Sequence, residues 1–191
     1  MEILKERILK EGKVRNGDVL KVGTFLNHQI DIKLLEEIGK EFKKRFSDCD
    51  ITKILTIESS GIAIACMAAQ SFGVPVVFAK KNTTKNLDGG VYSSQIYSFT
   101  HGKTYNVVVS KEILTADDKV LIIDDFLANG KAVQGLANIV EKSGASLVGA
   151  GIVIEKSFEP GGKEVRGKGI RVESLAKISA MSPDGKIEFE D

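Results

Sequence analysis

The apolar residues of this chain recur at two different spacings. Between residues 32 and 46, leucine, isoleucine and phenylalanine return every third or fourth position, which predicts an amphipathic helix with Asp31 as its N-cap. Elsewhere the apolar residues form short unbroken runs rich in valine and isoleucine, which indicates buried strands. The predicted strands are "KILTI" (53–57), "VPVVFA" (74–79), "YNVVVS" (105–110), "KVLII" (119–123) and "SLVGAGIVIEK" (146–156).

Helical segments separate several of these strands. The segment "GIAIACMAAQSF" (61–72) follows the first strand, and Val133, Leu136 and Val140 mark a helix before the last one. Such alternation predicts an α/β fold, namely an open, mainly parallel twisted sheet flanked by helices on both faces. No linker or repeat interrupts the pattern, so we expect a single domain over residues 1–191. Ligands of such folds bind beyond the carboxyl ends of the strands.

Composition narrows the possible partners. The chain has 191 residues, of which 42% are hydrophobic and 28% charged, with a formal net charge of +1. This balance does not favour nucleic acid or an anionic membrane, and the apolar runs are too short to span a bilayer. The N-terminal segment lacks the apolar stretch of a secretory signal, so we expect a cytoplasmic protein. Two cysteines and two histidines are too few to predict a disulfide framework or a zinc site.

The stretch "VLIIDDFLANGKA" (120–132) ends a predicted strand in two adjacent carboxylates, Asp124 and Asp125. The next turn enters a predicted helix, where consecutive backbone N–H groups and the helix dipole suit a phosphate. Ionised carboxylates instead accept hydrogen bonds from a vicinal diol. A diol close to a phosphate describes a ribose 5-phosphate. The turn residues predicted to hold the phosphate are Ala128, Asn129, Gly130, Lys131 and Ala132.

Other interpretations of this stretch remain open. A Walker A loop would need glycine at position 125 and serine or threonine at position 132, where this chain has Asp125 and Ala132. In isolation, the acidic pair also fits a simple cap of the turn, with Lys131 in solvent. A phosphotransfer receiver domain also ends a strand in aspartate, but it does not account for the "ANGKA" turn.

The same stretch resembles the ribose-phosphate signature of the type I phosphoribosyltransferases. Asn129 and Ala132 depart from that signature, because the family usually has threonine at both positions. "ESSGIA" (58–63) resembles the family's pyrophosphate loop. Its residues that would bind phosphoribosyl pyrophosphate are Ser59, Ser60 and Gly61.

The resemblance extends over nearly the whole chain and is closest to bacterial members that use xanthine. "KKNTTKNLDGGVYSSQIYSFT" (80–100) resembles the flexible loop that closes over the site, here roughly residues 81–100, with Lys81 near the leaving pyrophosphate. The implied reaction belongs to purine salvage and transfers 5-phosphoribosyl from phosphoribosyl pyrophosphate to xanthine, giving XMP and pyrophosphate. The resemblance also implies a homodimer, and Mg²⁺ held mainly through the substrate.

A small hood over the base site is a further implication of the resemblance. The hood would comprise roughly residues 1–35 and the C-terminal segment, over a core of roughly residues 36–160. An ammonium only donates hydrogen bonds, so a lysine there would favour a purine with a carbonyl at C6. The residues implied to bind xanthine are Leu20, Asn27 and Lys156. Leu20 also fits plain core packing, and Lys156 also fits a strand-end lysine in solvent.

Alternative functions share the same core. Ala128 stands where the hypoxanthine-guanine enzymes have an aspartate that accepts a proton, which suits a relatively acidic purine such as xanthine. A phosphoribosyltransferase for guanine or adenine would keep the sugar-phosphate site, although adenine does not suit Lys156. A regulator that senses phosphoribosyl pyrophosphate without catalysis would need a DNA-binding module, which neither the first thirty residues nor the net charge supplies.

Overall fold

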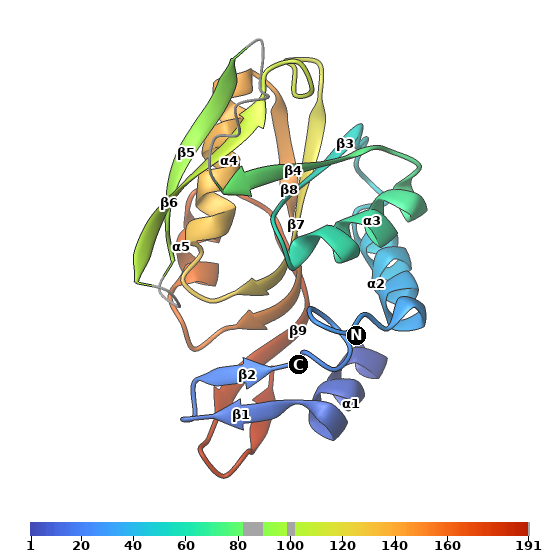
Figure 1. Cartoon of the computed structure of the whole chain (residues 1–191). Helices are drawn as coiled ribbons and strands as arrows, with labels where there is room; N and C mark the ends of the chain where they lie inside the picture. The colour runs from blue at the N-terminus through green and yellow to red at the C-terminus, as the bar shows by residue number, and fades with distance from the viewer. Residues whose placement is uncertain (82–89, 99–101, 191) are drawn as a thin grey trace.

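A mixed sheet forms the centre of the molecule (Figure 1). The computed structural model describes residues 1–81, 90–98 and 102–190, and within them the sheet has eight strands. In chain order they are β3 (Lys53–Ile57), β4 (Val76–Lys81), β5 (Val91–Ser98), β6 (Lys103–Ser110), β7 (Lys119–Leu127), β8 (Ser146–Lys156), β9 (Val172–Met181) and β10 (Ile187–Phe189). Their order across the sheet is β10-β9-β8-β7-β3-β4-β6-β5. The five central strands are parallel, and β10, β6 and β5 add antiparallel edges, so the predicted open, mainly parallel sheet is confirmed.

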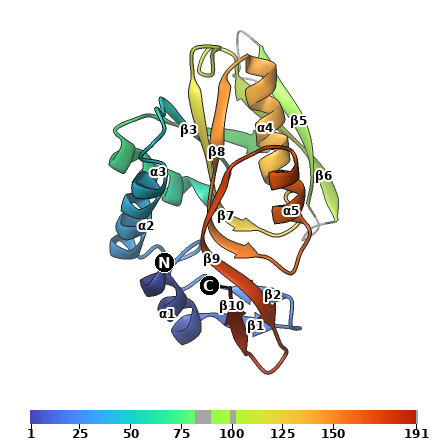
Figure 2. The ribbon, with the colours of Figure 1, turned by 180° about the vertical axis from the view of Figure 1, so that it is seen from behind.

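Helices cover both faces of this sheet (Figures 1 and 2). Alternate residues of β7 point to opposite faces, because side chains of a strand alternate. Leu121 and Ile123 join the core under α2 and α3, whereas Val120 and Ile122 join the core under α4. No helix within the described part of the chain is long and apolar enough to cross a lipid bilayer. The helices are α1 (Glu2–Glu11), α2 (Ile32–Arg45), α3 (Gly61–Phe72), α4 (Lys131–Ser143) and α5 (Gly161–Gly167).

The N-terminal segment forms a separate layer at the β9–β10 end of the sheet (Figures 1 and 2). After α1, the hairpin of β1 (Lys13–Arg15) and β2 (Val19–Lys21) leads into irregular turns before α2. Asp31 caps α2 as predicted, since its Oδ1 accepts the Leu34 N–H at 3.1 Å. The assignment of this layer as the hood over a base stays a prediction.

Residues 91–98, which we expected in a flexible loop, instead form β5. This strand pairs with β6 along its whole length, with Ile96 opposite Tyr105. Ile96 is buried and fits against Gly135 of α4, where an added Cβ would lie 2.4 Å from its Cγ1. Apolar packing on α4 therefore fixes a segment that the family resemblance had assigned to a loop. The remaining residues of the predicted loop, 82–89 and 99–100, lie outside the described residues.

Candidate active site

A cavity of about 250 Å³ opens at the carboxyl ends of β3 and β7. Its wall comes from four places: the ends of β3, β4 and β7, the start of α3, the hairpin of β5 and β6, and the turn before α4. This is the edge at which open α/β sheets bind ligands. The site residues predicted from the sequence that line it are Ser60, Lys81, Asp124, Asp125, Ala128, Asn129, Gly130, Lys131 and Ala132.

The two aspartates lie within β7, which extends four residues further than the predicted strand. Both side chains are buried, with 5% of Asp124 and 8% of Asp125 exposed. Asp124 Oδ1 accepts the N–H of Asp125, and Asp125 Oδ1 accepts the N–H of Phe126, each at 3.0 Å. Burial, and secondly the charge of Asp125, raise the pKa of Asp124 well above its usual value. A ligand hydroxyl that donates a hydrogen bond to Asp124 would stabilise its ionised form.

The turn 128–132 wraps around the start of α4. Gly130 has a φ of 74° and serves as the N-cap, a conformation that favours glycine. Asn129 accepts the N–H of Lys131 on its Oδ1 at 3.1 Å, so its side chain organises the turn itself. Lys131 Nζ lies 3.4 Å from Glu164 of α5. Its ammonium is therefore paired rather than free in solvent, while the turn still lines the cavity.

The segment after β3 brings α3 close to the aspartates. At Gly61, an added Cβ would lie 2.1 Å from Thr56 Oγ1 and 3.3 Å from Asp124 Oδ1, so only glycine allows this approach. Glu58 lines the cavity and accepts the N–H of Lys81 at 2.5 Å. Ser60 lines the cavity too, whereas Ser59 and Gly61 lie outside its described wall.

The three residues implied to bind the base also lie outside that wall. Asn27 Nδ2 donates to Asp125 Oδ2 at 2.9 Å, so it contacts the acidic pair directly. Lys156 Nζ donates to the backbone oxygen of Asp18 at 2.5 Å, in the hairpin of the N-terminal layer. Leu20 is 6% exposed and belongs to the hydrophobic core, as its alternative interpretation required. Contact of these residues with a base stays a prediction.

Aromatic residues of the β5–β6 hairpin were missed by the sequence reasoning. Tyr97 and Tyr105 both line the cavity, and Lys81 Nζ lies 5.6 Å from the centre of the Tyr105 ring. The useful signal was the share of β-branched and aromatic residues in 91–98, a segment that pairs with "KTYNVVVS" of β6. The resemblance of the segment to a flexible loop hid that signal.

Comparison with known proteins gives consistent matches. The phosphoribosyl transferase domain family matches residues 27–172. The chain is 59% identical to a xanthine phosphoribosyltransferase of Ruminiclostridium cellulolyticum over 100% of both chains. It is 57% identical to a xanthine phosphoribosyltransferase of Bacillus cytotoxicus, covering 99% of this chain and 95% of that one.

Solved structures resemble the fold. The adenine phosphoribosyltransferase of Trypanosoma brucei, solved with AMP, pyrophosphate and ribose-5-phosphate, superposes with a TM-score of 0.77 at 21% identity, covering 95% of this chain and 82% of that one. The enzyme of Giardia lamblia in complex with 9-deazaadenine superposes with a TM-score of 0.69 at 27% identity, covering 76% and 80%.

Proposed function

This chain belongs to the phosphoribosyltransferase family, and on that premise we propose that it transfers the 5-phosphoribosyl group of phosphoribosyl pyrophosphate to xanthine in purine salvage. The products are XMP and pyrophosphate. One observation carries the proposal: two buried carboxylates and the turn 128–132 line the same cavity, in a chain that matches xanthine phosphoribosyltransferases over its full length.

The sugar and its phosphate use different parts of the cavity. Asp124 and Asp125 accept hydrogen bonds from the ribose hydroxyls, which carry no charge to repel them. The 5-phosphate lies against the turn 128–132, where the positive end of the α4 dipole favours an anion. Asn129 and Ala132 replace the usual threonines of the family, so the backbone supplies most of the phosphate contacts.

The pyrophosphate leaves from the side of Ser60 and Lys81. Mg²⁺ prefers oxygen ligands and usually keeps one or two carboxylates besides substrate phosphates. The family resemblance implies that the substrate would provide most ligands of the ion, and the carboxylates of Glu58, Asp124 and Asp125 line the cavity. When bound, the ion offsets the charge of the departing diphosphate.

The base is recognised from the N-terminal layer and the end of β8. Lys156 already donates to a carbonyl oxygen, that of Asp18, and the C6 carbonyl of xanthine replaces this acceptor when the base binds. Ala128 offers no proton acceptor, so the base must lose its proton easily, as xanthine does.

The residues of this chain act mainly by positioning. The bond between ribose C1 and pyrophosphate breaks as positive charge develops on the sugar, and the base nitrogen then bonds to C1. The aspartates and the turn fix the ribose while Lys156 orients the base, which aligns the reacting atoms. Closure of the cavity excludes water and thereby limits hydrolysis of the activated sugar.

We also propose that the protein works as a cytoplasmic homodimer, on the strength of the family resemblance. Light scattering of the purified protein tests this directly, because a dimer has twice the 20.7 kDa mass of the chain.

A base panel tests the proposed reaction. Purified protein is incubated with phosphoribosyl pyrophosphate, Mg²⁺ and xanthine, guanine, hypoxanthine or adenine, and nucleotide and pyrophosphate are measured. Xanthine should give the highest kcat/KM, and the Asp124→Asn/Asp125→Asn double variant controls for contaminating enzymes. Binding of phosphoribosyl pyrophosphate without turnover of any base would instead favour a sensing regulator.

A further inference from the structure

Helix α5 lies directly against the proposed phosphate turn. The N–H of Gly161 donates to the backbone oxygen of Ala128 at 2.9 Å. An added Cβ on Gly161 would lie 2.3 Å from Ala128 O and 2.4 Å from Gly130 N, so the two backbones are in close contact. An added Cβ on Gly130 would lie 3.0 Å from Val165 of α5. The path of the turn therefore depends on where α5 lies.

An ion pair between a half-buried arginine and a buried glutamate ties α5 to the end of β8. Arg166 Nη1 lies 2.6 Å from Glu155 Oε1, and Arg166 Nη2 lies 2.7 Å from Glu155 Oε2. Glu155 is 2% exposed, and its Oε2 also accepts the hydroxyl of Ser174. At Gly162 an added Cβ would lie 2.1 Å from Glu155 Oε1, so glycine is needed for the helix to reach this carboxylate.

This ion pair is charged on both sides. Burial alone would raise the pKa of Glu155, but hydrogen bonds from Arg166 and Ser174 outweigh it and leave the pKa below its usual value. The hydrogen bonds that Arg166 donates to Glu155 raise the pKa of Arg166. A bidentate, mostly buried pair of this kind fixes the direction of both side chains.

Helix α5 has little stability of its own. It has seven residues, "GGKEVRG", three of which are glycines. An isolated helix shorter than about 12 residues is marginal in water, and each interior glycine costs about 1 kcal/mol relative to alanine. Contacts with the rest of the fold must therefore set its position: Val165 packs in the apolar core between the sheet and α4, and Arg166 pairs with Glu155 at the end of β8.

We infer that the Glu155–Arg166 ion pair is a positioning element for the 5-phosphate site: it anchors α5, and α5 holds the turn 128–132 in its phosphate-binding shape. The inference rests on the proposed function for the identity of the ligand. Glu155 precedes Lys156 on β8, and successive residues of a strand face opposite sides of the sheet. One strand end thus supports the phosphate turn on one side and presents the proposed base-binding lysine on the other.

The test separates phosphate binding from base binding. Arg166→Gln removes the positive charge and the bidentate hydrogen bonds, whereas Arg166→Lys keeps the charge without the bidentate geometry. We measure KM for phosphoribosyl pyrophosphate, KM for xanthine, and the Kd of ribose 5-phosphate by calorimetry. Arg166→Gln should raise KM for phosphoribosyl pyrophosphate and Kd of ribose 5-phosphate by about tenfold or more, with a smaller rise for Arg166→Lys. KM for xanthine should change less than about threefold.

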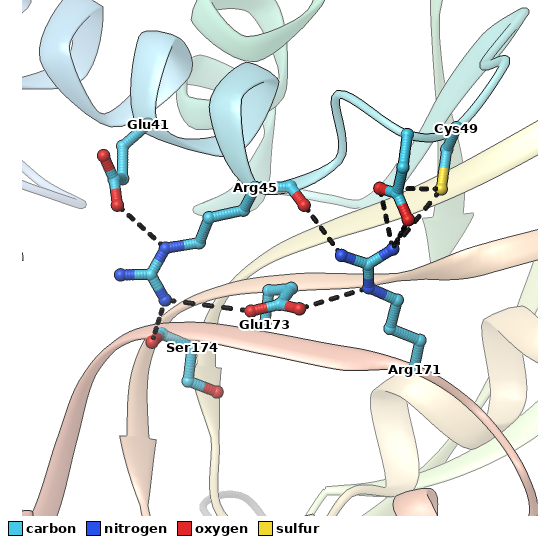
Figure 3. A network of polar contacts seen from close by, with 7 residues as sticks. Glu41, Arg45, Cys49, Arg171, Glu173 and Ser174 are labelled. Atoms are coloured by element: carbon cyan, nitrogen blue, oxygen red, sulfur yellow. Dashed lines mark hydrogen bonds and ion pairs between the residues drawn. The ribbon is translucent and has the colours of Figure 1, made fainter.

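Arg171→Gln provides the matched control. Figure 3 shows Arg171 and Arg45 on either side of Glu173, in a polar network that joins α2, the loop before β3 and β9. Arg171 also pairs with Asp48 at 2.9 and 2.8 Å, so its loss removes an arginine–carboxylate ion pair as well, in a more exposed place than the Glu155 pair. It makes no contact with α5 among the described interactions. Its variant should lower Tm and leave Kd of ribose 5-phosphate unchanged.

Two results would overturn the inference. The first is an unchanged Kd of ribose 5-phosphate in Arg166→Gln and Arg166→Lys. The second is a rise in KM that is equal for both substrates and is matched in Arg171→Gln at a similar loss of Tm, because it would then reflect general destabilisation. If the wild-type protein binds ribose 5-phosphate but does not use xanthine, the proposed reaction fails while the positioning role is still decided by the Kd values.

Discussion

Asn27 and Asp125 are joined by a hydrogen bond of 2.9 Å across 98 positions of sequence. The amide comes from the N-terminal layer and the carboxylate from the end of β7. The bond connects the segment expected over the base to the pair expected under the ribose. A change at Asn27 should therefore reach both substrates.

Substitutions of Asn27 test this connection. Asn27→Asp puts a second charge 2.9 Å from Asp125, so it should raise KM for phosphoribosyl pyrophosphate by about tenfold or more. Asn27→Ala removes the donor without adding charge and should affect mainly KM for xanthine. Steady-state kinetics with each substrate varied in turn measures both effects. Equal KM values for phosphoribosyl pyrophosphate in the two variants would contradict the electrostatic explanation.

Asp124→Asn and Asp125→Asn should each lower kcat/KM for phosphoribosyl pyrophosphate by about 10- to 100-fold, because hydrogen bonds to charged groups contribute about 1.5–3 kcal/mol. The fold should remain intact, as asparagine can still accept the N–H bonds of the β7 end through its Oδ1. Circular dichroism and kinetics on the same preparations check both statements. Near-normal activity in both variants would contradict the placement of the ribose beside these two aspartates.

The raised pKa of Asp124 gives a separate prediction for stability. An unfolded aspartate has a pKa of about 3.9, whereas burial and the charge of Asp125 raise the pKa in the folded protein. Between pH about 4 and the raised pKa, the folded state binds more protons than the unfolded state. The ionisation of Asp124 therefore lowers the free energy of unfolding progressively as pH rises through this range. Asp124→Asn removes that cost. Its Tm should exceed that of the wild type at neutral pH by a few degrees, about 2–4 °C per kcal/mol.

The pH series itself contains the control. At a pH well below about 4, Asp124 is protonated in both states and the Tm advantage of Asp124→Asn should vanish. Thermal unfolding without ligands, at several pH values, provides the comparison. A Tm difference that is constant with pH would show that packing rather than ionisation separates the two proteins.

The contact of Ile96 with Gly135 predicts how the hairpin wall is held. In Gly135→Ala the new Cβ would lie 2.4 Å from Ile96 Cγ1, so β5 must move or the core must be strained. Overpacking of this kind typically costs about 1–3 kcal/mol, and Tm should fall accordingly. Because Tyr97 and Tyr105 line the cavity from the same hairpin, KM for phosphoribosyl pyrophosphate should also rise.

Gly167→Ala is the comparison variant for this prediction. Nothing lies within 4 Å of an added Cβ at Gly167, so no overpacking arises there. Alanine favours helix over glycine by about 1 kcal/mol, and Tm should stay the same or rise. A fall in Tm for Gly167→Ala as large as that for Gly135→Ala would mean that glycine replacement in general, not contact with Ile96, is harmful.

Local patterns were sufficient to predict the sheet centre and to select the turn 128–132, which lines the cavity. Unbroken Val and Ile runs such as Val120–Ile123 have few alternatives to a buried parallel strand, and the acidic pair follows directly in sequence. The proposed ribose-phosphate part of the site is local in the chain, so one motif contains most of it.

Contacts between distant segments could not be predicted in this way. Glu155 and Arg166 are eleven positions apart, and nothing in "IEK" tells a buried paired glutamate from an exposed one. Our sequence reasoning singled out the neighbouring Lys156 and passed over Glu155. The pairing of Lys131 with Glu164 could not be predicted for the same reason: a surface lysine has many possible partners, and the fold selects one.

Lys156 predicts the choice of base. Its Nζ donates to the Asp18 oxygen at 2.5 Å and lies 3.7 Å from Glu159 Oε1, so a carbonyl acceptor already satisfies it. Xanthine, guanine and hypoxanthine can replace that acceptor through C6, but the amino group of adenine would leave a buried donor unpaired, at a cost of about 1–3 kcal/mol. Lys156→Ala should lower kcat/KM for xanthine by about 10- to 100-fold and leave Kd of ribose 5-phosphate unchanged. Lys119→Ala, which loses a surface pair with Asp50 at the opposite sheet edge, should keep both values. Efficient use of adenine by the wild-type protein would contradict this role of Lys156.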